Sequence, residues 1–317
     1  MAVDSHFPQW PLVAVLGPTG AGKSELALFL AEAFEGEILN CDSIQVYRGL
    51  DVGSAKLPLA ARRSIPHHLI DIASVDCELT AGEYARRARQ VLAEIRGRQR
   101  LPIVAGGTGF YLRALLDGLS PAPRRDEPLR TRLRALAERR PGVLHRFLRI
   151  HDPTAALRIH PNDRQKLIRA IELTLLAGQP ATGVQSVARD RLQGFAVLKL
   201  GLAPDRALLR ERLNTRSAAL FRSGLLEETQ TLLEAGFSPE AKPLQALGYK
   251  QALQILSGQV TLEQAIRECQ TKTRQYAKRQ MTWFRHEPDV VWLSGFGWNP
   301  VVQQQALDRV RALLARP

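Results

Sequence analysis

The sequence predicts an α/β protein in which a parallel β-sheet is flanked by helices and a helical segment is inserted between two strands. Short apolar runs alternate with segments of helical periodicity, which is typical of parallel sheets. A glycine-rich loop follows the first apolar run and precedes a helix. A basic stretch over residues 121–190, with fourteen Lys and Arg against seven Asp and Glu, interrupts the alternation.

The strands are predicted from short apolar runs that end at glycine or polar residues. They cover residues 12–17, 37–41, 101–105, 195–200 and 290–293. The polar motifs that follow these runs are expected at the carboxyl edge of the sheet, where ligands bind in such folds.

The helices are predicted from apolar residues that recur on one face. Residues 81–96 show the pattern with Tyr84, Ala88, Leu92 and Ile95. The other predicted helices are residues 25–34, 127–139, 143–151, 153–158, 163–176, 206–221, 225–235, 251–257, 262–284 and 302–314. Residues 178–183 are predicted to form a return loop.

A composition shift predicts the domain boundaries. Residues 120–125, with the sequence SPAPRR, are typical of a linker. We therefore expect a core domain formed by residues 1–120 and 191–317, and an inserted helical domain over residues 121–190.

Residues 17–24 match the phosphate-binding motif G-x-x-x-x-G-K-[ST] at every fixed position. They are Gly17, Pro18, Thr19, Gly20, Ala21, Gly22, Lys23 and Ser24. The backbone N–H groups of such a loop and the following helix N-terminus attract anions, and Lys23 adds a full charge. The Ser24 hydroxyl can ligate Mg²⁺. The motif predicts a P-loop NTPase-like sheet that binds a di- or triphosphate, but it does not name the reaction.

Composition favours a globular protein with a nucleic-acid partner. The chain has 317 residues, 45% of them hydrophobic and 24% charged, which are ordinary values. No apolar run could span a bilayer and no signal pattern begins the sequence, so a cytoplasmic location is expected. The net charge of +13 is typical of nucleic-acid binding, although a basic, arginine-rich composition alone would produce it. Residues 272–285 interleave aromatic and cationic side chains, which favours a binding surface.

Two further strand-end motifs carry candidate chemistry. Asp42 follows the second predicted strand, and it could cap the next helix, ligate Mg²⁺ or act as a general base beside the phosphates. Residues 106–111, with the sequence GGTGFY, place Thr108 at the same edge. Their glycines permit close backbone approach, which favours ligand contact over a simple turn.

Seven motifs occur in an order that resembles the bacterial tRNA dimethylallyltransferases, also called tRNA isopentenylpyrophosphate transferases. They are residues 17–24, 42–47 (DSIQVY), 53–56 (GSAK), 66–71 (PHHLID), 106–111 (GGTGFY), 246–250 (ALGYK) and 279–283 (RQMTW). The resemblance runs from residue 12 to about residue 293. Gly20, Ser54 and Leu247 stand where Ala, Thr and Ile are common, and none of these departures removes a group that the chemistry needs.

The resemblance implies transfer of a dimethylallyl group from dimethylallyl diphosphate to N6 of the adenosine 3′-adjacent to the anticodon of tRNA. The P-loop would then hold a diphosphate leaving group, with Mg²⁺ at Ser24. Thr19 would donate a hydrogen bond to the bridging oxygen, Arg216 would neutralise the diphosphate, and Asp42 would act as general base. The implied partners are dimethylallyl diphosphate and the tRNA anticodon stem-loop, with no membrane, and we expect a monomer.

The resemblance also implies three groups of tRNA-binding residues. Those near the target base are Asp42, Ser43, Ile44, Gln45 and Thr108. Those in the insertion, a small helical tRNA-binding domain, are Arg130, Gln165, Lys166, Leu167, Ile168 and Arg169. The third group is Ala246, Leu247, Gly248, Tyr249, Lys250 and Gln251.

Three alternatives share the phosphate loop. A small-molecule or nucleotide kinase would bind ATP, and an adenylate isopentenyltransferase would modify free AMP or ADP. Neither needs the basic insertion. An RNA-binding NTPase switch would bind RNA without altering it.

Overall fold

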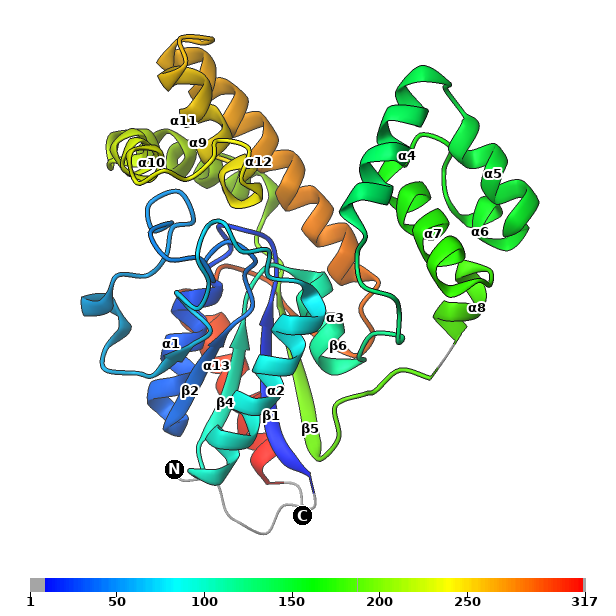
Figure 1. Cartoon of the computed structure of the whole chain (residues 1–317). Helices are drawn as coiled ribbons and strands as arrows, with labels where there is room; N and C mark the ends of the chain where they lie inside the picture. The colour runs from blue at the N-terminus through cyan, green and yellow to red at the C-terminus, as the bar shows by residue number, and fades with distance from the viewer. Residues whose placement is uncertain (1–8, 187, 316–317) are drawn as a thin grey trace. The chain divides into compact units, whose positions relative to one another are not determined.

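The structure, a computed structural model, describes residues 9–186 and 188–315. The chain forms two compact units (Figure 1). One unit comprises Met1–Leu116 and Leu192–Pro317 and carries the sheet, and the other comprises Asp117–Arg191 and is helical. Within the described ranges, no helix is both long and apolar enough to cross a membrane.

The sheet has six strands in the order β3-β2-β4-β1-β5-β6, and every adjacent pair is parallel. The strands are β1 (Trp10–Leu16), β2 (Gly36–Asn40), β3 (His67–His68), β4 (Leu101–Ala105), β5 (Phe195–Leu202) and β6 (Val290–Leu293). The predicted parallel sheet is confirmed. Strand β3 was not predicted, because two histidines are too short a run to show a period; they pair with Ile38 and Leu39.

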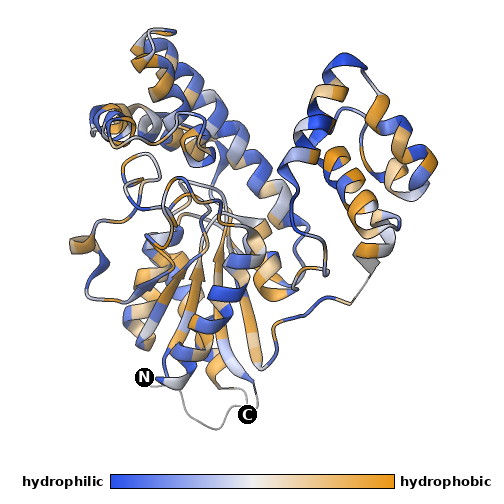
Figure 2. Ribbon diagram, in the orientation of Figure 1, coloured by the Kyte–Doolittle hydropathy of each residue, from blue (hydrophilic) through white to orange (hydrophobic). Residues whose placement is uncertain are grey.

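Alternate residues of β1 divide between two hydrophobic cores, as the two-residue period of a strand requires. Leu12, Ala14 and Leu16 belong to the core that includes residues of α2 and α3, whereas Val13 and Val15 belong to the core beneath α1 and α13. These helices are α1 (Lys23–Phe34), α2 (Ala81–Gly97), α3 (Gly109–Leu116) and α13 (Pro300–Leu314). The strands are hydrophobic along most of their length (Figure 2), which is typical of a sheet covered on both faces.

Four further helices belong to the sheet-bearing unit, with short 3₁₀ turns at Leu59–Arg62 and Lys242–Gln245. They are α9 (Arg206–Arg222), α10 (Leu225–Glu234), α11 (Tyr249–Leu256) and α12 (Leu262–Arg285). Helix α12 packs against α9, α11 and α3. It begins at a capping box in which Thr261 accepts from the Gln264 N–H and the Gln264 side chain accepts from the Thr261 N–H.

The helical unit contains α4 (Glu127–Arg139), α5 (Val143–His151), α6 (Pro153–Arg158), α7 (Arg164–Ala177) and α8 (Ala181–Ser186). Its core includes Leu133, Leu148, Leu167 and Ile171. The predicted return loop is wrong in its second half, because α8 begins within it. The buried Asp152 carboxylate accepts hydrogen bonds from the Thr182 backbone N–H and hydroxyl, and these bonds fix the first turn of α8.

Candidate functional site

The phosphate-binding loop connects β1 to α1, as its motif predicts. Gly22 precedes α1 with a φ of 88°, a left-handed conformation that favours glycine. A Cβ atom there would lie 2.6 Å from the Trp298 ring, so the close approach also requires glycine. Lys23 is the first residue of α1, and its Nζ donates a hydrogen bond to the Pro18 carbonyl oxygen at 2.8 Å.

Two cationic side chains lie beside this loop in an environment that disfavours their charge. Burial lowers the pKa of Lys23 to about 8, and the nearby Arg216 guanidinium acts in the same direction. Burial also lowers the pKa of Arg216, and the neighbouring Arg212 adds to the effect. Asp42 and Glu25 partly offset both shifts. Since a bound anion would stabilise both cations, the loop is suited to a polyanion.

Asp42 follows β2 and faces the same cations. Its Oδ1 accepts hydrogen bonds from the backbone N–H groups of Ile44 at 2.8 Å and Gln45 at 3.3 Å. Its Oδ2 accepts no hydrogen bond from the described residues. One oxygen therefore fixes the local turn, while the other is available to a proton donor. Asp42 can therefore cap the turn with one oxygen and act as a general base with the other, so these two predicted roles are compatible.

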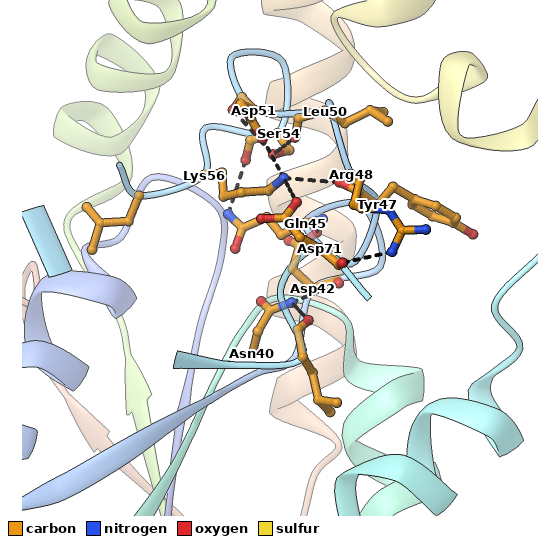
Figure 3. Close-up of polar contacts among 12 residues, drawn as sticks. Asn40, Asp42, Gln45, Tyr47, Arg48, Leu50, Asp51, Ser54, Lys56 and Asp71 are labelled. Carbon is orange, nitrogen blue, oxygen red and sulfur yellow. Dashed lines mark hydrogen bonds and ion pairs between the residues drawn. The ribbon is translucent and has the colours of Figure 1, made fainter. Parts of the chain in front are cut away.

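A buried lysine holds the loop that follows Asp42 (Figure 3). Lys56 Nζ donates to the Tyr47 carbonyl at 3.0 Å, to Asp51 Oδ1 at 2.5 Å and to Asp71 Oδ1 at 2.6 Å. The Lys56 side chain is only 3% exposed. Gln45 Nε2 donates to the carbonyl oxygens of Ser54 and Ala55, so the same network orients the Gln45 side chain. The GSAK motif thus positions the residues after Asp42.

Thr108 links the loop after β4 to the loop after β2. Its Oγ1 accepts a hydrogen bond from the Ser43 N–H at 3.0 Å and donates to Ser43 Oγ at 3.3 Å. Its own N–H donates to the Cys41 carbonyl at 3.2 Å. The structure therefore brings Ser43 and Thr108 together at the carboxyl edge, where the sequence predicted a shared site.

Gln280 was not predicted as a site residue, yet it contacts both loops. Its Oε1 accepts from the Thr19 N–H at 2.8 Å, and its Nε2 donates to the Gly107 carbonyl at 2.8 Å. Its side chain is buried in α12. One turn earlier on this helix lies Tyr276, whose pKa is raised to about 12, mainly by burial and then by Asp42. One face of α12 therefore borders the candidate site.

Arg212 and Trp298 close the outer side of the phosphate loop, and neither was predicted. Arg212 Nε donates to the Gly20 carbonyl at 3.1 Å, and its guanidinium lies 4.0 Å from the Trp298 ring centre. The Gly297 N–H donates to the Ala21 carbonyl at 2.9 Å. A groove of about 550 Å³ lies here, lined by Leu208, Glu211, Arg212, Thr215, Arg216, Phe296 and Trp298.

Known proteins match the chain over nearly its whole length. The family model described as IPP transferase matches residues 45–287. The chain is 56% identical over 306 residues to a tRNA dimethylallyltransferase of Solibacter usitatus, covering 96% of this chain and 100% of that protein. It is 53% identical over 301 residues to a tRNA dimethylallyltransferase of Koribacter versatilis, covering 95% and 98%. The chain belongs to the IPP transferase family. The resemblance identified from the motifs is thereby confirmed.

Solved structures of the IPP transferase family support the same fold. The full-length tRNA isopentenylpyrophosphate transferase of Bacillus halodurans is 34% identical, with a TM-score of 0.70 and coverage of 96% of both chains. A eukaryotic dimethylallyltransferase acting on tRNA is 29% identical, with a TM-score of 0.82 over 97% of this chain and 80% of that one. The predicted P-loop NTPase-like fold is confirmed.

In this member of the IPP transferase family, the outer part of α12 carries the basic residues noted in the sequence. A groove of about 370 Å³ is lined by Arg113, Lys278, Arg279, Thr282, Trp283 and His286. The Arg113 guanidinium lies 4.4 Å from the Trp283 ring centre. Of the interleaved cations and aromatics in residues 272–285, Lys278, Arg279 and Trp283 line this groove.

The predicted RNA contacts in the insertion fall into two classes. Gln165 and Lys166 are exposed on α7, whereas Leu167 and Ile168 are buried in the core of the helical unit. Arg169 donates to Glu172 Oε2 at 2.6 Å and to the Pro123 carbonyl at 3.1 Å. Arg130 Nε lies 3.9 Å from the fully buried Glu172. The two arginines thus pair with Glu172 inside the unit, whereas Gln165 is exposed and the exposed Lys166 pairs with Asp163 Oδ2 at 2.8 Å.

The third predicted group also has mostly internal contacts. Tyr249 is buried and its hydroxyl donates to Glu228 Oε1 at 2.6 Å, while Glu228 also accepts from the backbone of residues 51–53. Gln251 is buried and accepts from the Gly248 N–H. Lys250 is exposed. Burial of Tyr249 and Gln251 leaves Lys250 as the side chain of this group best placed for RNA.

The residues at the phosphate loop fit a metal that is held mainly by its substrate. Ser24 lies exposed in the first turn of α1. The described part of the chain has no group of three or more His, Cys, Asp or Glu arranged for a metal. Mg²⁺ typically keeps several waters and binds through substrate phosphates and one or two protein oxygens. A serine hydroxyl beside a phosphate loop matches that donor set.

Proposed function

We propose that the chain is a tRNA dimethylallyltransferase that prenylates N6 of the adenosine 3′-adjacent to the anticodon, using dimethylallyl diphosphate. The observation that carries the proposal is the position of Asp42 beside the two partly buried cations of the phosphate loop, Lys23 and Arg216. On this proposal, stabilisation of the leaving group and acceptance of the proton would both take place at one edge of the sheet. The tRNA dimethylallyltransferases to which the chain is 56% and 53% identical support the choice of substrates.

The phosphate loop would bind the diphosphate through its backbone N–H groups, Lys23 and Arg216. As the allylic C–O bond breaks, negative charge develops on the diphosphate, and these groups stabilise it more strongly than the ground state. The Thr19 hydroxyl would donate a hydrogen bond to the departing bridging oxygen. Ser24, together with diphosphate oxygens, would hold Mg²⁺. The metal would supply further charge neutralisation.

Asp42 would orient the nucleophile and accept its proton. The adenine amine is a weak nucleophile because its lone pair is shared with the ring, so positioning contributes as much as basicity. The N6 lone pair attacks the allylic carbon, a proton passes from N6 to Asp42 Oδ2, and diphosphate leaves. Ser43, Ile44, Gln45 and Thr108 line the adjacent edge and would contact the extruded base.

The anticodon stem-loop would bind the cationic surfaces through its phosphates. Lys166 and Gln165 on α7, and Lys250 on α11, are the exposed members of the predicted contacts. The α12 groove adds Lys278 and Arg279. We further propose that the protein acts as a monomer, and that it acts in the cytoplasm on its proposed tRNA substrate.

The decisive experiment incubates purified protein with unmodified tRNA, dimethylallyl diphosphate and Mg²⁺, and follows the mass of the RNA. We expect a gain of one dimethylallyl group on the adenosine 3′ to the anticodon. A tRNA with guanosine at that position serves as the control and stays unchanged. Modification of free AMP with no modification of tRNA would instead indicate an adenylate isopentenyltransferase. In a parallel reaction that contains ATP, ATP consumption without prenylation would indicate a kinase or an NTPase.

A further inference from the structure

The peptide unit between Pro18 and Thr19 is held from both sides. Its N–H donates to Gln280 Oε1 at 2.8 Å, and its carbonyl accepts from Lys23 Nζ at 2.8 Å. Gln280 is only 5% exposed, so both its amide groups need partners. Because rotation of this peptide would swing the attached Thr19 side chain, the Gln280 contact constrains the position of the Thr19 hydroxyl.

The other end of the same amide reaches the second loop. Gln280 Nε2 donates to the Gly107 carbonyl at 2.8 Å, and a Cβ at Gly107 would lie 2.3 Å from Nε2. The next residue, Thr108, accepts from the Ser43 N–H at 3.0 Å. Ser43 directly follows Asp42. Three hydrogen bonds, joined by the chain links Gly107–Thr108 and Asp42–Ser43, therefore connect the Thr19 peptide through Gln280 to Asp42.

We propose that Gln280 is a positioning residue that sets the separation between Thr19 and Asp42, and thereby aligns the diphosphate with the attacking amine. The proposal rests on the proposed function. A side-chain amide is suited to this role because it offers one acceptor and two donors on a single rigid plane. A leucine at position 280 has a similar size but could neither accept from the Thr19 N–H nor donate to the Gly107 carbonyl. A glutamate there could accept but could not donate to Gly107.

The test compares the wild type with Gln280→Leu in steady-state prenylation of tRNA. Since small misplacements of reacting groups cost about 10²-fold in rate, we expect kcat to fall by about that factor. Gln280 contacts backbone and not substrate, so the KM for dimethylallyl diphosphate changes by less than about threefold. The dissociation constant for inorganic diphosphate, measured by calorimetry, also changes by less than about threefold. Gln305→Leu, an exposed position on α13, is the matched control and keeps wild-type kcat.

A double-mutant cycle with Thr19→Ala separates positioning from loss of structure. If Gln280 acts through Thr19, the double variant has the same kcat as Thr19→Ala alone. Once the Thr19 hydroxyl is removed, loss of the residue that positions it has no further effect on the rate. Additive losses would overturn the proposal, as would an unchanged kcat in Gln280→Leu. Parallel loss of kcat, diphosphate affinity and melting temperature would also overturn it, because that pattern indicates a structural role. An inactive wild type would refute the proposed function itself, whereas an active wild type matched by Gln280→Leu would refute only this inference.

Discussion

Lys23 donates its hydrogen bond to the Pro18 carbonyl, a group of the phosphate loop itself, at 2.8 Å. A bound diphosphate would offer this ammonium a stronger, charged acceptor. The loop cation is thus already oriented along the loop, in a buried environment that lowers its pKa.

Diphosphate binding should take up a proton near pH 8. Without ligand the pKa of Lys23 is about 8, so the side chain loses its charge as the pH rises through that value. A bound anion raises this pKa, and affinity therefore declines above about pH 8. Calorimetry at pH 8 in buffers of different ionisation enthalpy measures the uptake. Lys23→Arg should remove the protein's share of it, and equal uptake by both proteins would contradict the assignment.

Asp42→Asn should lower the prenylation rate by about 10²-fold or more, because an amide cannot accept the N6 proton. The asparagine Oδ1 can still accept from the backbone N–H of Ile44, as Asp42 Oδ1 does at 2.8 Å. Folding and tRNA affinity should therefore match the wild type. Single-turnover rates and filter binding measure the two quantities. A near-normal rate would confine Asp42 to its role in the turn.

Removing the Lys56 ammonium should destabilise the fold less than removing the two carboxylates that pair with it, those of Asp51 and Asp71. Lys56 is buried, whereas the Asp51 and Asp71 side chains are 62% and 41% exposed. Lys56→Met leaves carboxylates that water can solvate. Asp51→Asn with Asp71→Asn leaves a buried ammonium without a countercharge, which costs about 3–5 kcal/mol. Urea unfolding should rank the double aspartate variant as the less stable, and the opposite order would contradict this account.

Lys166→Ala and Arg169→Ala should separate RNA binding from folding of the insertion. Lys166 is exposed, so its loss should weaken tRNA binding and reduce the salt dependence by about one counterion without lowering stability. Arg169 pairs with Glu172, whose side chain is fully buried, so its loss should lower the stability of the helical unit by about 3 kcal/mol. Salt titrations of binding and thermal melts distinguish the two. If the salt dependence of tRNA binding is unaltered in Lys166→Ala, this lysine does not contact RNA phosphate, and the proposal that α7 binds tRNA is wrong.

Local patterns account for what the sequence could predict. The phosphate loop, Asp42 and Thr108 each follow an apolar strand, and strand ends of a parallel sheet converge at one edge. Gln280 could not be found in this way, because its partners Thr19 and Gly107 are 261 and 173 residues distant along the chain. Only the packing of α12 within the sheet-bearing unit brings them together.

In the insertion, some of the predicted tRNA contacts fall on residues whose side chains are buried in the core. The resemblance to the family implies tRNA contacts over residues 165–169. Leu167 and Ile168, however, belong to the core of the helical unit. Their spacing to Ile171, three and four residues further on, is the helical period of a buried face. That periodicity is present in the sequence and marks Leu167 and Ile168 as core residues, although the resemblance groups them with the exposed Gln165 and Lys166.

Helix α12 carries Tyr276, Gln280 and Trp283 along one side, at intervals of four and three residues. An α-helix turns about 100° per residue, so inserting or deleting one residue between Tyr276 and Gln280 would rotate everything beyond it out of phase. Gln280 would leave the phosphate loop, and Trp283 would leave Gly109, over which its ring now lies. In related sequences the number of residues from Tyr276 to Trp283 must therefore stay fixed, even where the outward-facing side chains of this helix differ.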